Sequence, residues 1–289
     1  MAKAPTAVEI RPYQVGFGDC FLLSFVYGPR DRRHVLIDFG TTGLSEKRKK
    51  GEPPPPRPRK PAPKPSEHLP RVAADIRAVC EATSTSPRLT AVVATHRHAD
   101  HISGFATDGA SGGAGKIIAA LRPKVVIQPW TEDPKAAPQA THASTTPATG
   151  AARLVASLAS MNLLAQGIVD LAARGALDRL SATTCKQLEF LGLDNIANRS
   201  AIDNLREMGS KPHGRSVYAR YGDDVGLGRL LPGVKVRVLG PPDLTQSKDI
   251  AKQTSKNKEE FWHLMGATTV AAAARSTRGA SGGARIPAT

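Results

Sequence analysis

The sequence predicts an α/β fold, and three observations support that class. Short apolar segments rich in β-branched residues, such as residues 89–94 and 124–128, alternate with segments whose apolar residues recur at helical spacing. A dense run of histidines directly follows one of the apolar segments. The chain has 289 residues and is 40% hydrophobic, which is sufficient for the core of one layered domain. Strands that alternate with helices are typical of a sheet with crossover connections.

Before the histidines, the chain is predicted to form a strand, a polar insertion, a helix and a second strand. The first strand ends at Asp38. Residues 44–68 are basic and rich in proline, so they cannot form a packed core and are predicted to be a disordered insertion. Residues 69–83 show helix-like spacing of apolar residues, and residues 89–94 form the next strand. The helix therefore returns the chain to the sheet as a crossover.

After the histidines we expect a helix at residues 115–121 and a strand at residues 124–128. A long insertion follows at residues 131–210. Two further strands are expected at residues 216–221 and 234–239, and a tail at residues 266–289. The insertion combines loop sequence with helical patterns over residues 150–180 and 202–208. The tail has no acidic or aromatic residue and is predicted to be disordered, which leaves residues 1–265 as the main domain.

The most informative motif is the run from Thr95 to His101, which also contains His96, His98 and Asp100. Side chains two residues apart in extended backbone point to the same side, so His96 and His98 can bind one metal ion. Once the chain turns, Asp100 and His101 can face a second ion or position a water molecule. These residues therefore predict a metal site at the rim of the sheet.

Imidazole and carboxylate ligands without thiolate favour zinc, with manganese and iron(II) as competitors, and the spacing allows one or two ions. The expected chemistry is activation of a zinc-bound water, with Asp100 as the catalytic group that orients the water or accepts its proton. The alternatives are a chance cluster of polar residues and a structural ion. Structural zinc sites usually use cysteine and are closed, so the catalytic interpretation is favoured.

Residues 95–101 resemble the His-X-His-X-Asp-His signature of the metallo-β-lactamase-fold hydrolases. Residues 15–23 and 34–40 resemble the opening hairpin of that superfamily and its first motif, an aspartate at the end of a strand. Asp38 matches that aspartate, so the resemblance implies that Asp38 orients the histidine loop by hydrogen bonding and does not bind metal. It also implies an αββα sandwich and a metal-dependent hydrolase activity.

Within the superfamily, residues 18–20 and 231–242 are most similar to the branch related to the hydrolase domain of DNA-uptake competence proteins. This placement implies that nucleic acid or another phosphodiester is the leading candidate substrate. Members normally carry three later motifs, namely two histidines and an aspartate that bridges two metals, and none is evident here. We therefore expect the N-terminal half of the fold plus a helical insertion, with a truncated or frame-shifted end.

The remaining candidates for later ligands do not follow convincing strands. His142 lies in loop-like sequence, His213 follows a Lys-Pro pair, and His263 lies near a helix-like end. Asp223 and Asp224 follow a Tyr-Gly pair, a pattern that is also common in turns. None of these five residues is predicted to be a ligand.

Composition limits the class of protein further. No apolar stretch approaches the length of a membrane span, and the N-terminus leads into no signal-like run. The three cysteines, Cys20, Cys80 and Cys185, are odd in number and far apart, which predicts free thiols in a reducing cytoplasm. The net charge is +15, and residues 46–71 alone hold nine basic and three acidic residues. That segment either attracts phosphate backbones or only aids solubility.

Three functions remain open on the sequence alone. The first is a metal-dependent hydrolase of an ester, amide or phosphodiester, acting on a small molecule or on nucleic acid. The second is a truncated family member that binds metal but has weak or no activity. The third is a basic nucleic-acid-binding module in which the histidine loop is residual.

Overall fold

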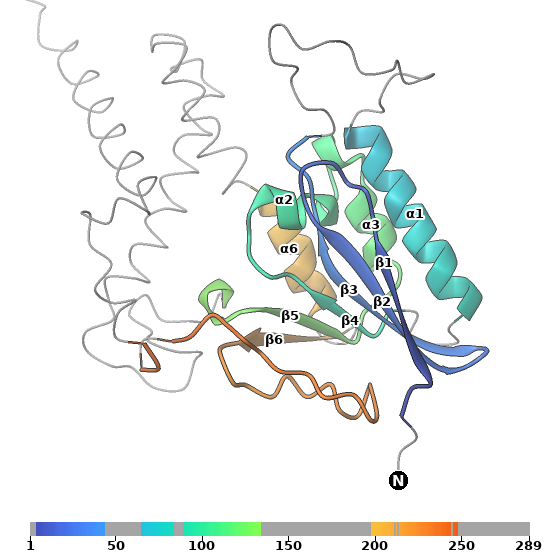
Figure 1. The fold of residues 1–289 in the computed structure, drawn as a ribbon. Coiled ribbons are helices and arrows are strands. Elements are labelled where there is room, and N and C mark those ends of the chain that lie inside the picture. Colours follow the sequence, from blue (N-terminus) through green and yellow to red (C-terminus); the bar gives the residue numbers. More distant parts are fainter. Residues whose placement is uncertain are drawn as a thin grey trace, which may run out of the picture.

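The structure, a computed structural model, describes residues 4–43, 65–83, 89–133, 198–210, 212, 214–243 and 245–247. Its centre is a six-stranded sheet whose strands follow one another in chain order from β1 to β6 (Figure 1). Helices connect the parallel part of the sheet and lie on one of its faces (Figure 1). The prediction of a mixed α/β fold is therefore confirmed.

The sheet has an antiparallel half and a parallel half. The antiparallel strands are β1 (Ala7–Pro12), β2 (Cys20–Gly28) and β3 (Asp31–Phe39). The parallel strands that follow β3 are β4 (Ala91–Val93), β5 (Val125–Pro129) and β6 (Arg215–Ala219). Because β3, β4 and β5 are parallel, the residues that follow them meet at one edge of the sheet.

The helices are α1 (Pro65–Thr83), α2 (Ala99–Ile102), α3 (Ala114–Ala119) and α6 (Arg199–Met208). Short 3-10 turns occupy Ser103–Phe105, Gly109–Ser111 and Trp130–Glu132. Two boundaries differ from the prediction. Helix α1 begins at Pro65, so residues 65–68 belong to the helix and not to the predicted insertion. The boundary was missed because the first turn of α1 is polar and shows no apolar periodicity. Helix α6 lies within residues 131–210, yet it packs in the main helical layer.

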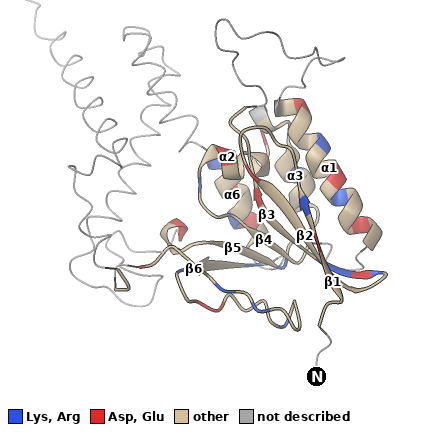
Figure 2. Cartoon of the chain, viewed as in Figure 1, with Lys and Arg blue, Asp and Glu red and all other residues tan. Residues whose placement is uncertain are grey.

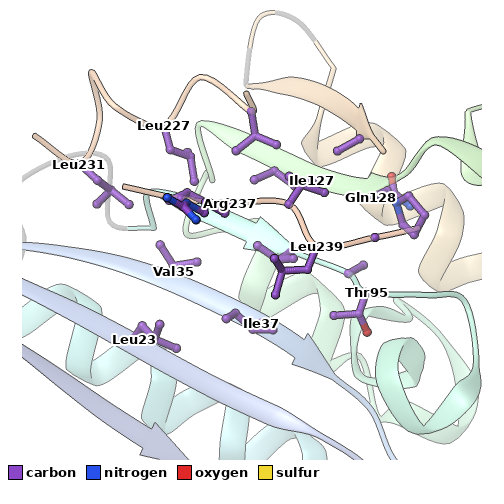
Figure 3. A pocket seen from close by; sticks show the side chains of 18 of the residues that line it. Leu23, Val35, Ile37, Thr95, Ile127, Gln128, Leu227, Leu231, Arg237 and Leu239 are labelled. Carbon is purple, nitrogen blue, oxygen red and sulfur yellow. The ribbon is translucent and has the colours of Figure 1, made fainter. Parts of the chain in front are cut away.

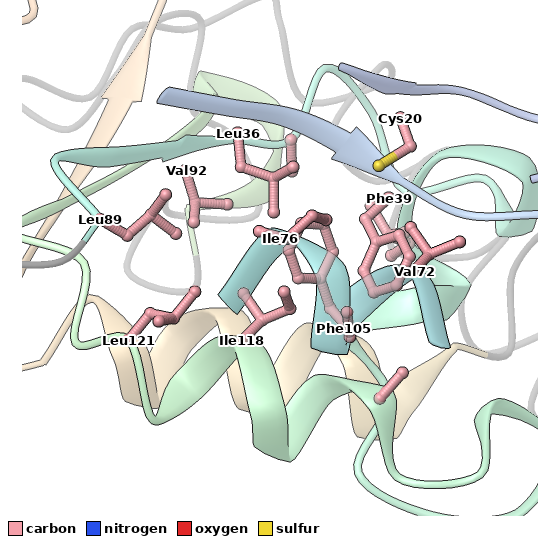
Figure 4. Close-up of a cluster of buried hydrophobic side chains, with 14 of the residues drawn as sticks. Cys20, Leu36, Phe39, Val72, Ile76, Leu89, Val92, Phe105, Ile118 and Leu121 are labelled. Atoms are coloured by element: carbon pink, nitrogen blue, oxygen red, sulfur yellow. The ribbon is translucent and has the colours of Figure 1, made fainter. Parts of the chain in front are cut away.

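The main core lies between the sheet and the helices (Figure 4). Leu36 and Val92 project from neighbouring strands toward Ile76 of α1 and Ile118 of α3, and all four side chains are fully buried. Farther along, Phe39 and Phe105 contact each other edge to face, with ring centroids 5.8 Å apart. Helix α6 contributes Ala201, Leu205 and Met208 to the same cluster. This packing holds the end of β3 rigidly at the edge where the histidine run lies.

Among the described residues, an irregular segment packs against the opposite face of the sheet. Val35, Val125 and Ile127 contact Val225, Leu227 and Leu231 in a second, smaller cluster. Figure 1 shows this segment, residues 220–243, on the side of the sheet away from α1. The described residues include no second sheet, so the αββα sandwich stays a prediction. The strand predicted at residues 234–239 is wrong: its residues alternate as in a strand but pair with no strand in the described part.

Several predictions fall outside the described residues. They concern the segments 44–64, 150–180 and 266–289 and the residues His142, Cys185, His213 and His263. Of the other cysteines, Cys20 and Cys80 are buried free thiols, as predicted. Among the described helices, none combines the length and the apolar character needed to cross a bilayer.

Candidate metal centre

The histidine run leaves the end of β4 and turns into the short helix α2. The carbonyl of His98 accepts hydrogen bonds from the amides of His101 and Ile102, both at 3.0 Å, which starts the helix. Ala99 and Ile102 are buried, whereas Asp100 and His101 between them are only partly covered. The apolar residues therefore anchor the turn, and the polar residues are left at the rim of the sheet.

The structure brings three of the predicted ligands together. His96, Asp100 and His101 each offer a ligand atom, and these atoms lie within 4.8 Å of one another. The rings of His96 and His101 are 3.8 Å apart, and the rings of His96 and His98 are 4.7 Å apart. His98 was expected to share an ion with His96, but its ligand atoms lie outside the group of three.

Asp38 hydrogen-bonds to both ends of the histidine run. Its carboxylate accepts from the amide of Thr95 at 2.8 Å and from the hydroxyl of Thr95 at 2.6 Å. It also pairs with Nδ1 of His101 at 2.9 Å. The side chain is buried, and burial raises the pKa of Asp38, while the hydrogen bonds from Thr95 and His101 act in the opposite direction. Asp38 thus contacts both Thr95 and His101 through hydrogen bonds.

This hydrogen-bond network assigns the tautomers of two histidines. His101 donates its Nδ1 proton to Asp38, so Nε2 is the nitrogen that would be available to bind a metal ion. The hydroxyl proton of Thr95 goes to Asp38, so the 3.1 Å contact between Thr95 and His96 requires His96 to donate from Nδ1. Nε2 of His96 is then also unprotonated. Both rings therefore offer the lone pair that a metal ion needs.

The donor set fits a divalent ion such as zinc. Two ligand atoms at tetrahedral positions, each about 2.0–2.1 Å from zinc, are about 3.4 Å apart. Nε2 of His101 and Oδ2 of Asp100 are 3.5 Å apart, close to that spacing. Burial, followed by the neighbouring charges of His101 and His98, lowers the pKa of His96 to about 4. Burial also lowers the pKa of His98, so both imidazoles are neutral at pH 7, the form that binds metal.

Asp19 is a site residue that sequence reasoning missed. Its carboxylate lies 3.5 Å from Nδ1 of His101, and Asp19, Asp38 and His101 form a second group of possible ligands. Asp19 directly precedes β2, and Cys20, the first residue of β2, pairs with Phe39 beside Asp38. Asp19 could have been predicted from this position only if the pairing register of β2 and β3 were known. Sequence spacing alone does not give that register.

Two glycines allow three loops to meet behind the site. A Cβ atom at Gly18 would lie 2.3 Å from the carbonyl oxygen of Gly40 and 2.5 Å from that of Asp100. A Cβ atom at Gly40 would lie 2.4 Å from the carbonyl oxygen of Ala99. The amide of Asp19 also donates to the carbonyl of Asp100 at 3.0 Å. The glycine loop therefore supports the backbone that presents Asp100.

Arg97, which lies between His96 and His98 in the sequence, contacts the turn that follows β5. It makes a bidentate ion pair with Glu132, with Nε within 2.9 Å of both carboxylate oxygens. Glu132 belongs to the turn Trp130–Glu132 that follows β5. The pair ties the histidine run to the neighbouring strand end, and it is partly buried, which favours a well-defined geometry.

The two aspartates considered for a later ligand form turns. Asp223 accepts from the amide of Arg220 at 3.0 Å, and Asp224 accepts from the amide of Gly226 at 2.8 Å. Neither belongs to the groups of possible metal ligands in the described part of the chain.

The comparison with known proteins adds no candidate: no family model, no curated protein and no solved structure matches this chain.

Proposed function

We propose that the protein is a metal-dependent hydrolase whose centre consists of His96, Asp100 and His101. The observation that carries the proposal is the hydrogen bonding of Asp38, which sets the tautomer of His101 directly and that of His96 through Thr95. Three protein ligands with an open position are typical of catalytic zinc sites, whereas structural sites use four. The proposal is for one ion, with zinc favoured and manganese or iron(II) as competitors.

When bound, a divalent metal ion lowers the pKa of water to about 7 and so supplies a nucleophile at neutral pH. The residues of this chain have separate tasks. His96, Asp100 and His101 would hold the ion, and the hydrogen bond to Asp38 fixes the orientation of the His101 ring. Asp100 is the carboxylate nearest to Nε2 of His101, and it orients the attacking water or accepts its proton. The substrate bond is an ester, an amide or a phosphodiester.

The test begins with metal content. The full-length protein, purified after growth with zinc, is measured by elemental analysis beside His96→Ala, His101→Ala and the control His68→Ala. His68 lies on α1 and hydrogen-bonds to the carbonyl of Gln14, away from the cluster. We expect about one zinc per chain in the parent and the control, and loss of zinc in both site variants.

Turnover is then measured on a nitrophenyl ester and on bis-nitrophenyl phosphate. We expect Asp100→Asn to reduce kcat on the accepted substrate by about 100-fold or more, because the substitution removes both a metal ligand and the proposed general base. Zinc binding without turnover would contradict the proposed hydrolase activity but not the proposed metal binding. Absence of zinc from the parent protein under replete conditions would contradict both proposals.

A further inference from the structure

The face of the sheet away from the helices contains an apolar cavity of about 540 Å³ (Figure 3). Val35, Ile37 and Ile127 line it from the sheet, and Leu227 and Leu231 line it from the opposite segment. Figure 3 shows Thr95 at one end, with Leu239 beside it. A volume of about 300–1,000 Å³ is typical of sites that receive a bound group. This cavity is therefore large enough to receive side chains from outside.

The apolar face continues past the cavity to the edge of the sheet. Val8 and Ile10 on β1 pair with Phe25 and Leu23, which line the cavity, so their side chains lie on the same face. Val8 is 48% exposed and Ile10 is 63% exposed. At the mouth of the cavity, Leu239 is 81% exposed. Contiguous exposed apolar surface of this kind marks an interaction site.

Residues 234–239 border the cavity, and most of their backbone groups have no hydrogen-bond partner among the described residues. Val234, Val236 and Val238 alternate with Lys235 and Arg237, as in a strand. Within the described part of the chain, the amides of residues 235–239 have no hydrogen-bond partner, and only the Val238 carbonyl accepts a bond, from Gly222 at 3.0 Å. Unpaired donors and acceptors along a strand-like segment are a template for another strand.

We propose that residues 234–239 accept a β-strand from a protein partner whose side chains alternate between aliphatic and acidic. The backbone of that strand would pair with residues 235–239, and its aliphatic side chains would enter the cavity. Its acidic side chains would face Lys235, which is exposed, and Arg237, which is exposed at the border of the cavity; neither cation forms an ion pair with a described residue. A second copy of this chain fits less well, because antiparallel self-pairing of residues 235–239 places Arg237 directly opposite Arg237 of the other copy.

The binding experiment uses the full chain and a short blocked, fluorescent peptide that alternates glutamate with valine. Anisotropy compares this peptide with one of the same composition in which the valines are contiguous. We expect the alternating peptide alone to bind, and the double variant Lys235→Glu/Arg237→Glu to weaken it at least tenfold. Arg229→Glu is the matched control, because Arg229 is an exposed cation of the same segment outside residues 234–239. It should change affinity less than twofold.

Hydrogen exchange of residues 235–239 provides the second readout. We expect rapid exchange in the free protein and protection when the alternating peptide is added. The proposal would be overturned if both peptides bound equally, or if the double variant bound the alternating peptide as tightly as the parent protein does. So would protection without peptide, which would show that another part of this chain or a second copy already pairs there; sedimentation separates those two outcomes. The test requires no metal, so its result is independent of the hydrolase proposal.

Discussion

At the scale of single residues, Asp38 combines an unusual backbone with a central place in the hydrogen bonding. Its φ angle is +51°, in the left-handed region that aspartate and asparagine enter more readily than other side chains. That conformation ends β3 and leaves the carboxylate in contact with Thr95 and His101. Backbone strain of this kind occurs where the surrounding structure determines the position of a functional group. Asp38 is therefore the residue to change first.

Asp38→Asn should preserve the backbone conformation and remove the charge that holds His101. Loss of such an outer hydrogen-bond partner typically lowers metal affinity by about 10–100-fold, and we expect that range here. Competition with a zinc chelator measures the change. Asp31→Asn is the control, because Asp31 lies at the start of the same strand and its exposed carboxylate pairs with Arg33 at 3.3 Å. Equal zinc affinity in Asp38→Asn and Asp31→Asn would contradict the assigned role.

At the scale of secondary-structure elements, His34 connects two strands and a helix. It is fully buried on β3, with Nδ1 at 2.8 Å from the hydroxyl of Ser24 on β2 and Nε2 at 2.9 Å from the hydroxyl of Thr83 on α1. Burial lowers the pKa of His34 from 6.5 to about 4, with the charges of Arg11 and Arg32 acting in the same direction. The folded protein therefore keeps this histidine neutral where an unfolded chain would protonate it.

This shift predicts a loss of stability in mild acid. Between pH 6.5 and about 4 the unfolded chain binds a proton at His34 that the folded chain does not, so the free energy of unfolding falls as pH falls through that window. The full effect is at most about 3 kcal/mol, at about 1.36 kcal/mol per pKa unit.

Urea unfolding of the parent and of His34→Gln, at pH 7 and at pH 5 with saturating zinc, measures this effect. Glutamine keeps a neutral hydrogen-bonding side chain, so the variant should lose less stability than the parent between the two pH values. Parallel losses in the two proteins would exclude His34 as the source.

At the scale of the whole molecule, the positive charge lies mainly outside the described fold. The complete chain has 40 basic and 25 acidic residues, a net charge of +15. The described residues hold 17 basic and 16 acidic side chains, a net charge of +1. Figure 2 shows both signs interspersed over the helices and the segment after β6. The described fold therefore offers almost no net positive charge to a phosphate backbone.

Binding of duplex DNA at low salt should consequently depend on the basic residues of segment 46–71. Replacing Lys47, Arg48, Lys49 and Lys50 together with glutamine should weaken this binding. The slope of the logarithm of the binding constant against the logarithm of the salt concentration should become shallower by up to about 0.9 per lost phosphate contact. Zinc content should stay unchanged. Lys116→Gln with Lys124→Gln is the control, since both residues are exposed on the described fold. If this control weakens binding as much as the fourfold variant, the sheet domain itself carries the DNA interface.

The alternation of apolar segments determined the class of fold and most of its elements. Residues 89–94 and 124–128 were recognisable as strands because a buried strand needs a run of apolar, β-branched side chains whatever its neighbours are, and residues 216–221 because their side chains alternate. The histidine run was recognisable for a similar reason, since ligands for one ion must be close and the sequence places four of them within six residues. Local chemistry of this kind is present in the sequence itself.

Only the tertiary structure decided which of those side chains meet. Asp19 joins the site because β2 and β3 pair in one register, and His98 lies outside the ligand group because α2 turns the chain after it. Residues 234–239 alternate as a strand does, yet no described strand lies beside them. Sequence periodicity records which side of an element is apolar, whereas pairing and ligand geometry depend on residues far away in the chain, which only the folded sheet brings together.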